Sequence, residues 1–153
     1  MQLSRLRINL DIIKEIIIMA KQGFATSDRR KVEVLDDTVG AKTIGVHDCG
    51  TVFVLNNTGA DAHTIPSAAS CGEGWWCRFV VQSITGNQSI TLGVTGDTAV
   101  LVEASTDGAE DVFNLTGANP NVLQVLTAAD IAGDEVEIIV ANGQFFCKGI
   151  SKS

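Results

Sequence analysis

Three consecutive residues bring a histidine, a carboxylate and a thiol together in the chain: His47, Asp48 and Cys49. A nucleophilic cysteine needs a base within hydrogen-bonding reach, and residues i and i+2 of a strand lie on the same face. A Cys49–His47 pair is therefore one interpretation, and a surface turn, which we favour, is the other. No further residue completes a triad, and the sequence holds no nucleophile-elbow, phosphate-loop, zinc-protease or EF-hand motif. We expect no enzymatic activity and interpret His63 as structural.

Four cysteines are the remaining candidates for metal or redox chemistry: Cys49, Cys71, Cys77 and Cys147. Their spacings match no zinc pattern, so we expect no metal and no cofactor. A protein made and kept inside a cell is expected to hold them reduced and half-buried. Alternatively, Cys71 and Cys77 close a small loop through a disulfide if the protein acts outside the cell.

The adjacent tryptophans Trp75 and Trp76 are the unusual aromatic feature of the sequence. Neighbouring residues of a strand point to opposite faces, so one indole is expected in the core and the other outside. The outward indole would be an interface anchor, because tryptophan is enriched at binding hot spots, or a platform for a sugar ring. In a third interpretation both are buried where a loop joins a strand.

Composition and charge narrow the class of protein. The 153 residues fit one domain; 45% are apolar and only 19% are charged, with a mean hydropathy of +0.22, which indicates that a partner covers some apolar surface. Residues 1–31 contain seven basic and three acidic side chains, whereas residues 32–153 contain four basic and fifteen acidic side chains. Such an acidic body repels phosphate, so nucleic acid is not the expected partner. No segment is long and apolar enough to span a membrane, so we expect no membrane partner.

The N-terminal region has its own pattern. Residues 1–18 show an apolar heptad pattern typical of a helix, but Lys14-Glu15 can be encoded as AAGGAG, a bacterial ribosome-binding sequence, ahead of Met19. This segment is thus either a helix or a translated leader. Residues 19–31 form a basic arm, predicted to dock on an acidic surface or to be a solvated linker. Its candidate contact residues are Phe24, Arg29, Arg30 and Lys31.

Residues 32–153 are predicted to form the β domain, because the hydrophobic period changes from 3.6 to 2. The expected strands are 32–35, 51–55, 77–84, 88–94, 98–103, 121–127, 135–141 and 144–148. Asn142-Gly143 between two apolar runs predicts a type I′ hairpin turn, and 128–131 could form a helical turn. Short strands with frequent glycine turns indicate an all-β fold, an antiparallel β-sandwich or barrel preceded by a helical or extended arm.

Two stretches of the sequence resemble a known class of proteins. GTVFVLNN at 50–57, TIPSAA at 64–69 and GWWCRFVV at 74–81 follow a strand, Thr-Ile-Pro, small-residue and aromatic pattern. AGDEVEIIVANGQFF at 132–146 resembles the closing hairpin of the same class, with two phenylalanines where Trp-Tyr is usual. These are small β-structured virion proteins of tailed bacteriophages, and the chain is most similar to the capsid decoration (cement) proteins.

The resemblance implies a structural role without chemistry. A decoration protein binds the lattice of the major capsid protein on the outer capsid surface of the virion, is made in the host cytoplasm, and stabilises the head, here as an expected homotrimer. The alternative implied by the same scaffold is a tail-fibre or receptor-binding module that binds glycan. In either case the candidate partner-binding residues are those of the arm together with Trp75 and Trp76.

Overall fold

The computed structural model describes residues 31–105, 113–116, 121–125 and 132–151. All of them belong to one compact unit that begins at Lys31. The predicted helix or leader at 1–18, the basic arm up to Arg30, and the helical turn predicted at 128–131 lie outside the described residues.

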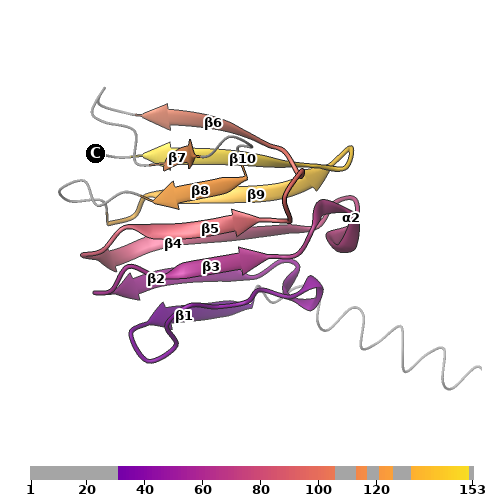
Figure 1. Ribbon diagram of the computed structural model, residues 1–153. Helices are drawn as coiled ribbons and strands as arrows, with labels where there is room; N and C mark the ends of the chain where they lie inside the picture. The colour runs from indigo at the N-terminus through magenta and orange to yellow at the C-terminus, as the bar shows by residue number, and fades with distance from the viewer. Residues whose placement is uncertain (1–30, 106–112, 117–120, 126–131, 152–153) are drawn as a thin grey trace, which may run out of the picture. The chain divides into compact units, whose positions relative to one another are not determined.

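Ten strands make up most of the described chain (Figure 1). They are β1 (Val32–Asp36), β2 (Val52–Asn57), β3 (Ala62–Ile65), β4 (Trp76–Ile84), β5 (Gln88–Leu92), β6 (Ala99–Ser105), β7 (Phe113–Thr116), β8 (Val122–Val125), β9 (Glu135–Ala141) and β10 (Gln144–Ser151). A 3₁₀ turn, η1 (Val46–Asp48), precedes β2, and a single helical turn, α2 (Ala68–Cys71), precedes β4. The predicted all-β class is therefore confirmed for the described residues.

The strands form two sheets, one of six strands in the order β1-β2-β4-β9-β10-β6 and one of four in the order β3-β5-β8-β7. Both sheets are mixed: β1, β2 and β4 are parallel neighbours, as are β10 with β6 and β3 with β5, while the other pairs are antiparallel. The expected all-antiparallel arrangement was wrong. From β2 to β6 the chain alternates between the sheets, so a strand often returns to its sheet in the same direction.

A barrel is also excluded for the described strands, because no pairing joins the outermost strands of either sheet. The inner faces of the two sheets do contact each other. The rings of His63 on β3 and Phe79 on β4 lie 6.4 Å apart. A β-carbon added at Gly149 on β10 would lie 2.7 Å from Cδ2 of Phe113 on β7, so that ring packs directly on the backbone of β10.

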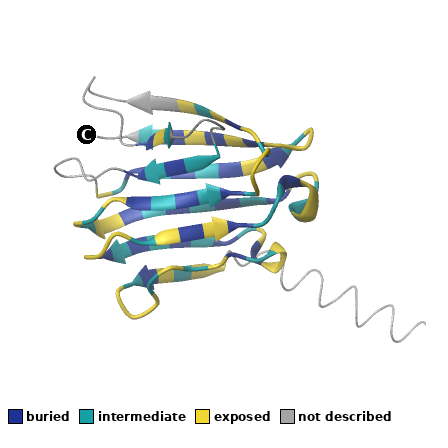
Figure 2. Ribbon diagram, in the orientation of Figure 1, coloured by how far each residue is buried: buried dark blue, intermediate teal, exposed yellow. Residues whose placement is uncertain are grey.

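The core lies between these inner faces. Buried and more exposed residues alternate along the strands, as expected when one face of each sheet is covered (Figure 2). Phe53 and Phe79, on neighbouring strands, stack with ring centroids 5.2 Å apart, and both are fully buried. Burial of a side chain of this size contributes roughly 1.5–3 kcal/mol, so the interdigitated apolar faces supply the main stabilisation of the fold.

The turn predicted at Asn142-Gly143 is confirmed. Both residues have positive φ, 50° and 70°, as a type I′ turn requires, and β9 and β10 pair antiparallel from Ala141 opposite Gln144. The structure adds elements that the periodicity did not predict, namely η1, β3, α2 and β7. In β3 a buried polar residue, His63, occupies an inward position and interrupts the apolar alternation.

Candidate protein-docking face

The side of the six-stranded sheet that faces away from the core, which we call the outer face, carries an apolar row across four strands. The strand registers place Trp76 of β4 next to Ile139 of β9, Ile139 next to Phe146 of β10, and Phe146 next to Val100 of β6. Ile139, Phe146 and Val100 are 36%, 41% and 43% exposed, and Trp76 is half-buried. Four large apolar side chains thus lie in one line on the surface.

The next row of the outer face is charged in its centre. Arg78, Glu137, Lys148 and Val102 are neighbours on β4, β9, β10 and β6. Arg78 donates from Nη2 to Oε2 of Glu137 at 2.8 Å and from Nη1 to Oε2 of Glu135 at 3.4 Å. The hydrogen bond to Glu137 and the charge of Glu135 raise the pKa of Arg78, against the lowering effect of its partial burial. With Glu135 of the following row included, the two positive and two negative charges of this region balance.

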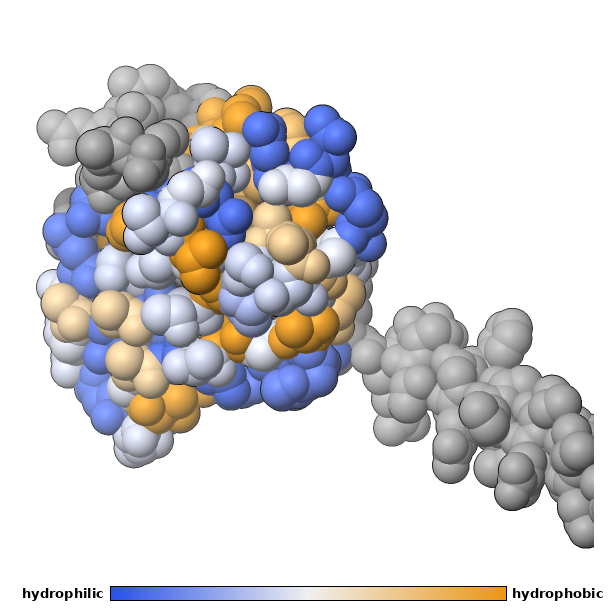
Figure 3. Space-filling view, turned by 45° about the vertical axis from the view of Figure 1, so that its right-hand side comes forward, coloured by the Kyte–Doolittle hydropathy of each residue, from blue (hydrophilic) through white to orange (hydrophobic). Residues whose placement is uncertain are grey.

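The edge strand β1 extends the outer face. Val32 and Val34 are 61% and 45% exposed and lie next to Val52 and Val54 of β2. Of the nine exposed large hydrophobic residues among those described, six lie on this face. They are Val32, Val34, Val100, Val102, Ile139 and Phe146. An exposed apolar row such as that from Trp76 to Val100 is typical of a protein interaction site. Val32 and Val34 lie on the other side of Arg78 from this row. On the side of the molecule seen in Figure 3, hydrophobic residues are interspersed with hydrophilic ones.

The two tryptophans point to opposite faces, as predicted. Trp75 is 3% exposed, and its indole Nε1 donates to the backbone oxygen of Val46 at 3.0 Å. Trp76 is on the outer face, where its ring lies against Gly50. The interpretation with both indoles buried was wrong. Only Trp76 is therefore placed to contact a partner, at one end of the apolar row.

Sequence reasoning missed the rest of the apolar row. The sequence did contain a feature that indicates this row: pairs of adjacent large apolar residues within the predicted strands. Ile138-Ile139 and Phe145-Phe146, like the tryptophan pair, must each send one side chain outward. In the isoleucine and phenylalanine pairs the structure buries the first residue and exposes the second, and in the tryptophan pair it buries Trp75 and leaves Trp76 half-buried.

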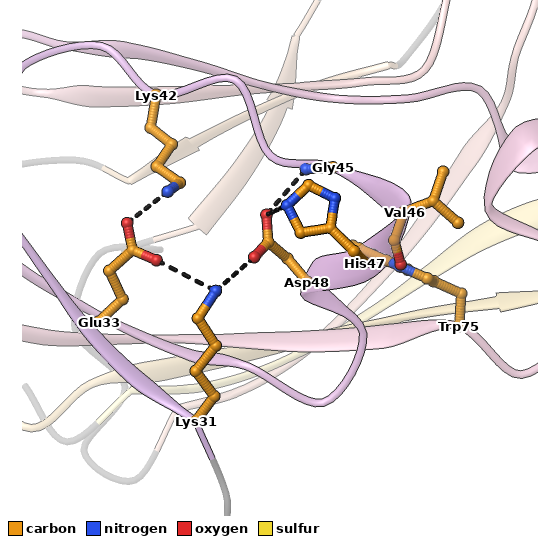
Figure 4. Close-up of polar contacts among 8 residues, drawn as sticks. All are labelled: Lys31, Glu33, Lys42, Gly45, Val46, His47, Asp48 and Trp75. Carbon is orange, nitrogen blue, oxygen red and sulfur yellow. Dashed lines mark hydrogen bonds and ion pairs between the residues drawn. The ribbon is translucent and has the colours of Figure 1, made fainter. Parts of the chain in front are cut away.

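The last residue of the predicted arm, Lys31, is bound within the β unit (Figure 4). Its Nζ lies 2.6 Å from Oδ1 of Asp48 and 3.5 Å from Oε2 of Glu33, which also receives Nζ of Lys42. The backbone oxygen of Lys31 accepts the N–H of Val52 at 2.8 Å. Lys31 thus fixes the point where the chain enters the β unit.

Asp48 holds this junction together. Its side chain is 2% exposed, and Oδ2 accepts the backbone N–H of Gly45 at 2.9 Å. Burial alone would raise the pKa of Asp48, but the hydrogen bonds from Lys31 and Gly45 outweigh it and lower the pKa below the usual value. The carboxylate is therefore charged and bound at neutral pH.

The histidine–cysteine pair considered from sequence is not assembled. Val46–Asp48 form a 3₁₀ turn rather than a strand, so His47 and Cys49 do not share a face. The side chain of His47 is 84% exposed, and its Nε2 lies 3.6 Å from Oδ2 of Asp48. The surface-turn interpretation is confirmed.

All four cysteines are free thiols in the structure, including the Cys71–Cys77 pair considered for a disulfide. Burial raises the pKa of Cys71 to about 11 and that of Cys147 to about 12, and it raises the pKa of Cys77 well above the usual value. These three thiols are protonated at neutral pH. Within the described residues, no group of three or more histidine, cysteine, aspartate or glutamate side chains is arranged to hold a metal ion.

Comparison with known proteins gives no family: no family model matches the chain, and neither a curated protein nor a solved structure matches it. None of the helices among the described residues has the length and apolar character needed to cross a membrane.

Proposed function

We propose that this chain is a structural virion protein of a tailed bacteriophage, a decoration protein that binds the lattice of the major capsid protein on the outer surface of the head. Its two sheets would form a β-sandwich that acts as a rigid scaffold for protein contacts. Its action would be mechanical, because a protein bridging neighbouring capsid subunits resists the outward pressure of the packaged DNA. The homotrimer implied by the sequence resemblance is part of this proposal.

The observation that carries the proposal is the outer face. Leaving Ile139, Phe146 and Val100 in water is unfavourable by about 25 cal/mol for each Å² of apolar surface. A monomer without partners gains nothing from such a row. A protein that binds a lattice or its own copies covers it. The face therefore supports a role in assembly.

The basic arm supports the same role from the sequence. Phe24, Arg29 and Arg30 lie outside the described residues, and we propose that they contact an acidic surface of the capsid. Exposed ion pairs contribute at most ~1 kcal/mol each, so several must act together. Lys31 differs from these residues, because its ammonium group is already bound to Asp48.

The deciding experiment is the copy number of the chain in purified virions of the phage that encodes it, measured by quantitative mass spectrometry. Hundreds of copies, removable from the head without loss of the tail, are expected for a decoration protein. A handful of copies located at the tail would overturn the proposal in favour of a fibre or receptor-binding module. Absence from virions would overturn both.

A second experiment tests the arm separately. Emptied capsids are incubated with the full chain or with a variant lacking residues 1–30, which retains Lys31 and its bond to Asp48. Binding is expected to weaken in the truncated chain and to lose part of its salt dependence. Unchanged affinity and salt dependence would show that the arm is no part of the contact.

A further inference from the structure

We propose that the outer face of the six-stranded sheet pairs with the same face of a second copy of this chain, around a two-fold axis that runs along the strands between β9 and β10. The inference rests on the proposed function, in that it takes the outer face to be a protein-docking surface. It goes further by naming the occupant of that face.

Charge favours a second copy as the occupant. Residues 32–153 carry only four basic side chains against fifteen acidic ones, so two copies repel each other over most of their surface. Two of the four basic residues, Arg78 and Lys148, lie on the outer face beside Glu135 and Glu137. This balanced region is where another acidic body can approach. A strongly charged partner of either sign would gain little from it.

The strand registers make the face complementary to itself. The proposed axis sets β9 of one copy opposite β10 of the other, and β4 opposite β6. Ile139 then faces Phe146 of the second copy, and Trp76 faces its Val100, because each pair shares one row. In the next row Glu137 faces Lys148 of the second copy. The large apolar groups of the first row meet one another, and Glu137 meets Lys148 twice by symmetry. Arg78 faces Val102 of the second copy, and its charge stays paired with Glu135 and Glu137 of its own chain.

The area is close to what a specific contact needs. Under the proposed axis, the strand registers let β9 overlap β10 and β4 overlap β6 over about six or seven residues each. With about 4.8 Å between strands and about 3.3 Å per residue, the four strands overlap over roughly 19 Å by 21 Å in projection. Two copies would bury about 800 Å² in projection, near the roughly 1,000 Å² lower bound of specific interfaces. The outer residues of β1 lie outside this overlap.

The pairing predicts an even number of chains in solution. Sedimentation equilibrium of the full chain is expected to give two chains of 16.1 kDa, or six if trimers pair through this face. Val100→Lys places a cation opposite Trp76 of the second copy, and it is expected to halve the number of chains. Val94→Lys is the matched control, because Val94 is 59% exposed and lies in the loop between β5 and β6, off the outer face. It should leave the assembly unchanged.

Charge reversal tests the register itself. Lys148→Glu and Glu137→Lys should each raise the dissociation constant about tenfold or more, because like charges then meet. A mixture of the two variants should recover wild-type affinity, since each copy supplies the opposite charge to the other. Circular dichroism and thermal melting of every variant establish that it is folded. No recovery in the mixture would overturn the proposed register.

The outcomes separate this inference from the proposed function. A wild-type chain that is a trimer at micromolar concentration overturns the pairing and leaves the proposed function standing. A monomer overturns the pairing and also the homotrimer in that proposal, and the copy number in virions then decides the virion role alone. If Val100→Lys preserves the assembly but abolishes capsid binding, the lattice is the occupant and the inference is wrong. If the assembly halves as expected but the chain is absent from virions, the pairing holds and the proposed function fails.

Discussion

The carboxylate of Glu73, in the loop before β4, accepts the backbone N–H of Asn142 at 2.9 Å. Its second oxygen accepts the N–H of Gly143 at the same distance. Two donors of the type I′ turn are satisfied by a side chain sixty-nine residues earlier. The hairpin that closes the six-stranded sheet is thus held both by its own turn and by a distant loop.

Glu73→Ala is therefore expected to lower the free energy of unfolding by about 1–2 kcal/mol, because two charge-assisted hydrogen bonds at an exposed site are lost. Glu73→Gln, which keeps one acceptor oxygen, should lose less. Denaturant unfolding of the three proteins checks the order. Equal stability of the alanine variant and the wild type would show that water replaces the carboxylate without cost.

Asp48 makes the junction at Lys31 sensitive to acid. Its pKa is lowered in the folded state, so its contribution to stability is complete above the unfolded value near 3.8. That contribution is lost as the pH falls through the lower folded value. Asp48→Asn should cost about 1–2 kcal/mol at neutral pH. Between about pH 5 and about pH 2, the variant should lose less unfolding free energy than the wild type does. Parallel slopes for the two proteins would contradict this.

Protonation of His63 should lower the stability of the protein at a higher pH than protonation of Asp48 does. It is fully buried, and its Nδ1 accepts the backbone N–H of Lys42 at 3.1 Å, so a proton on Nδ1 would displace that bond. Burial lowers the pKa of His63, against the opposing charge of Asp61 and a hydrogen bond with Gln88. The unfolded chain therefore binds the proton first, and stability is expected to fall as the pH drops below about 6.5 toward the folded value.

The variant His63→Asn tests this dependence, because its amide oxygen can accept the N–H of Lys42 without titrating. It should be less stable at neutral pH, because the smaller side chain leaves a gap, yet it should not lose stability between about pH 7 and about pH 5 as the wild type does. Denaturant unfolding over this range is the measurement. An unchanged pH dependence would assign the titration to another group.

Gly149 and Phe113 test the contact between the sheets. Gly149→Ala would press a methyl group into the ring of Phe113, and overpacking of this kind costs typically 1–3 kcal/mol. Combining it with Phe113→Leu should cost less than the sum of the two single changes, because the smaller side chain makes room. Additive effects in this double-mutant cycle would show that the two residues do not meet.

Eight of the ten strands and the closing turn could be predicted from the sequence, because both are local properties. The alternation in 135–141 and the Asn142-Gly143 pair depend on neighbours a few residues away. β3 was missed because His63 is buried through bonds to other segments, and β7 because its four residues are too few to show a period. The parallel pairing of β1, β2 and β4 was missed because strand direction depends on where the connecting segments cross.

The candidate site, like the fold, has one part that the sequence predicts and another that depends on long-range contacts. The sequence by itself determined that Trp75 and Trp76 point to opposite faces. Successive side chains of a strand alternate between the two faces of the sheet, regardless of what covers either face. Only the tertiary structure decided that Trp76 stands in line with Ile139, Phe146 and Val100, because these residues come from four strands whose registers are fixed by long-range pairing. A row across a sheet has no period along the chain. Its existence follows from how the buried faces of the two sheets align the strands.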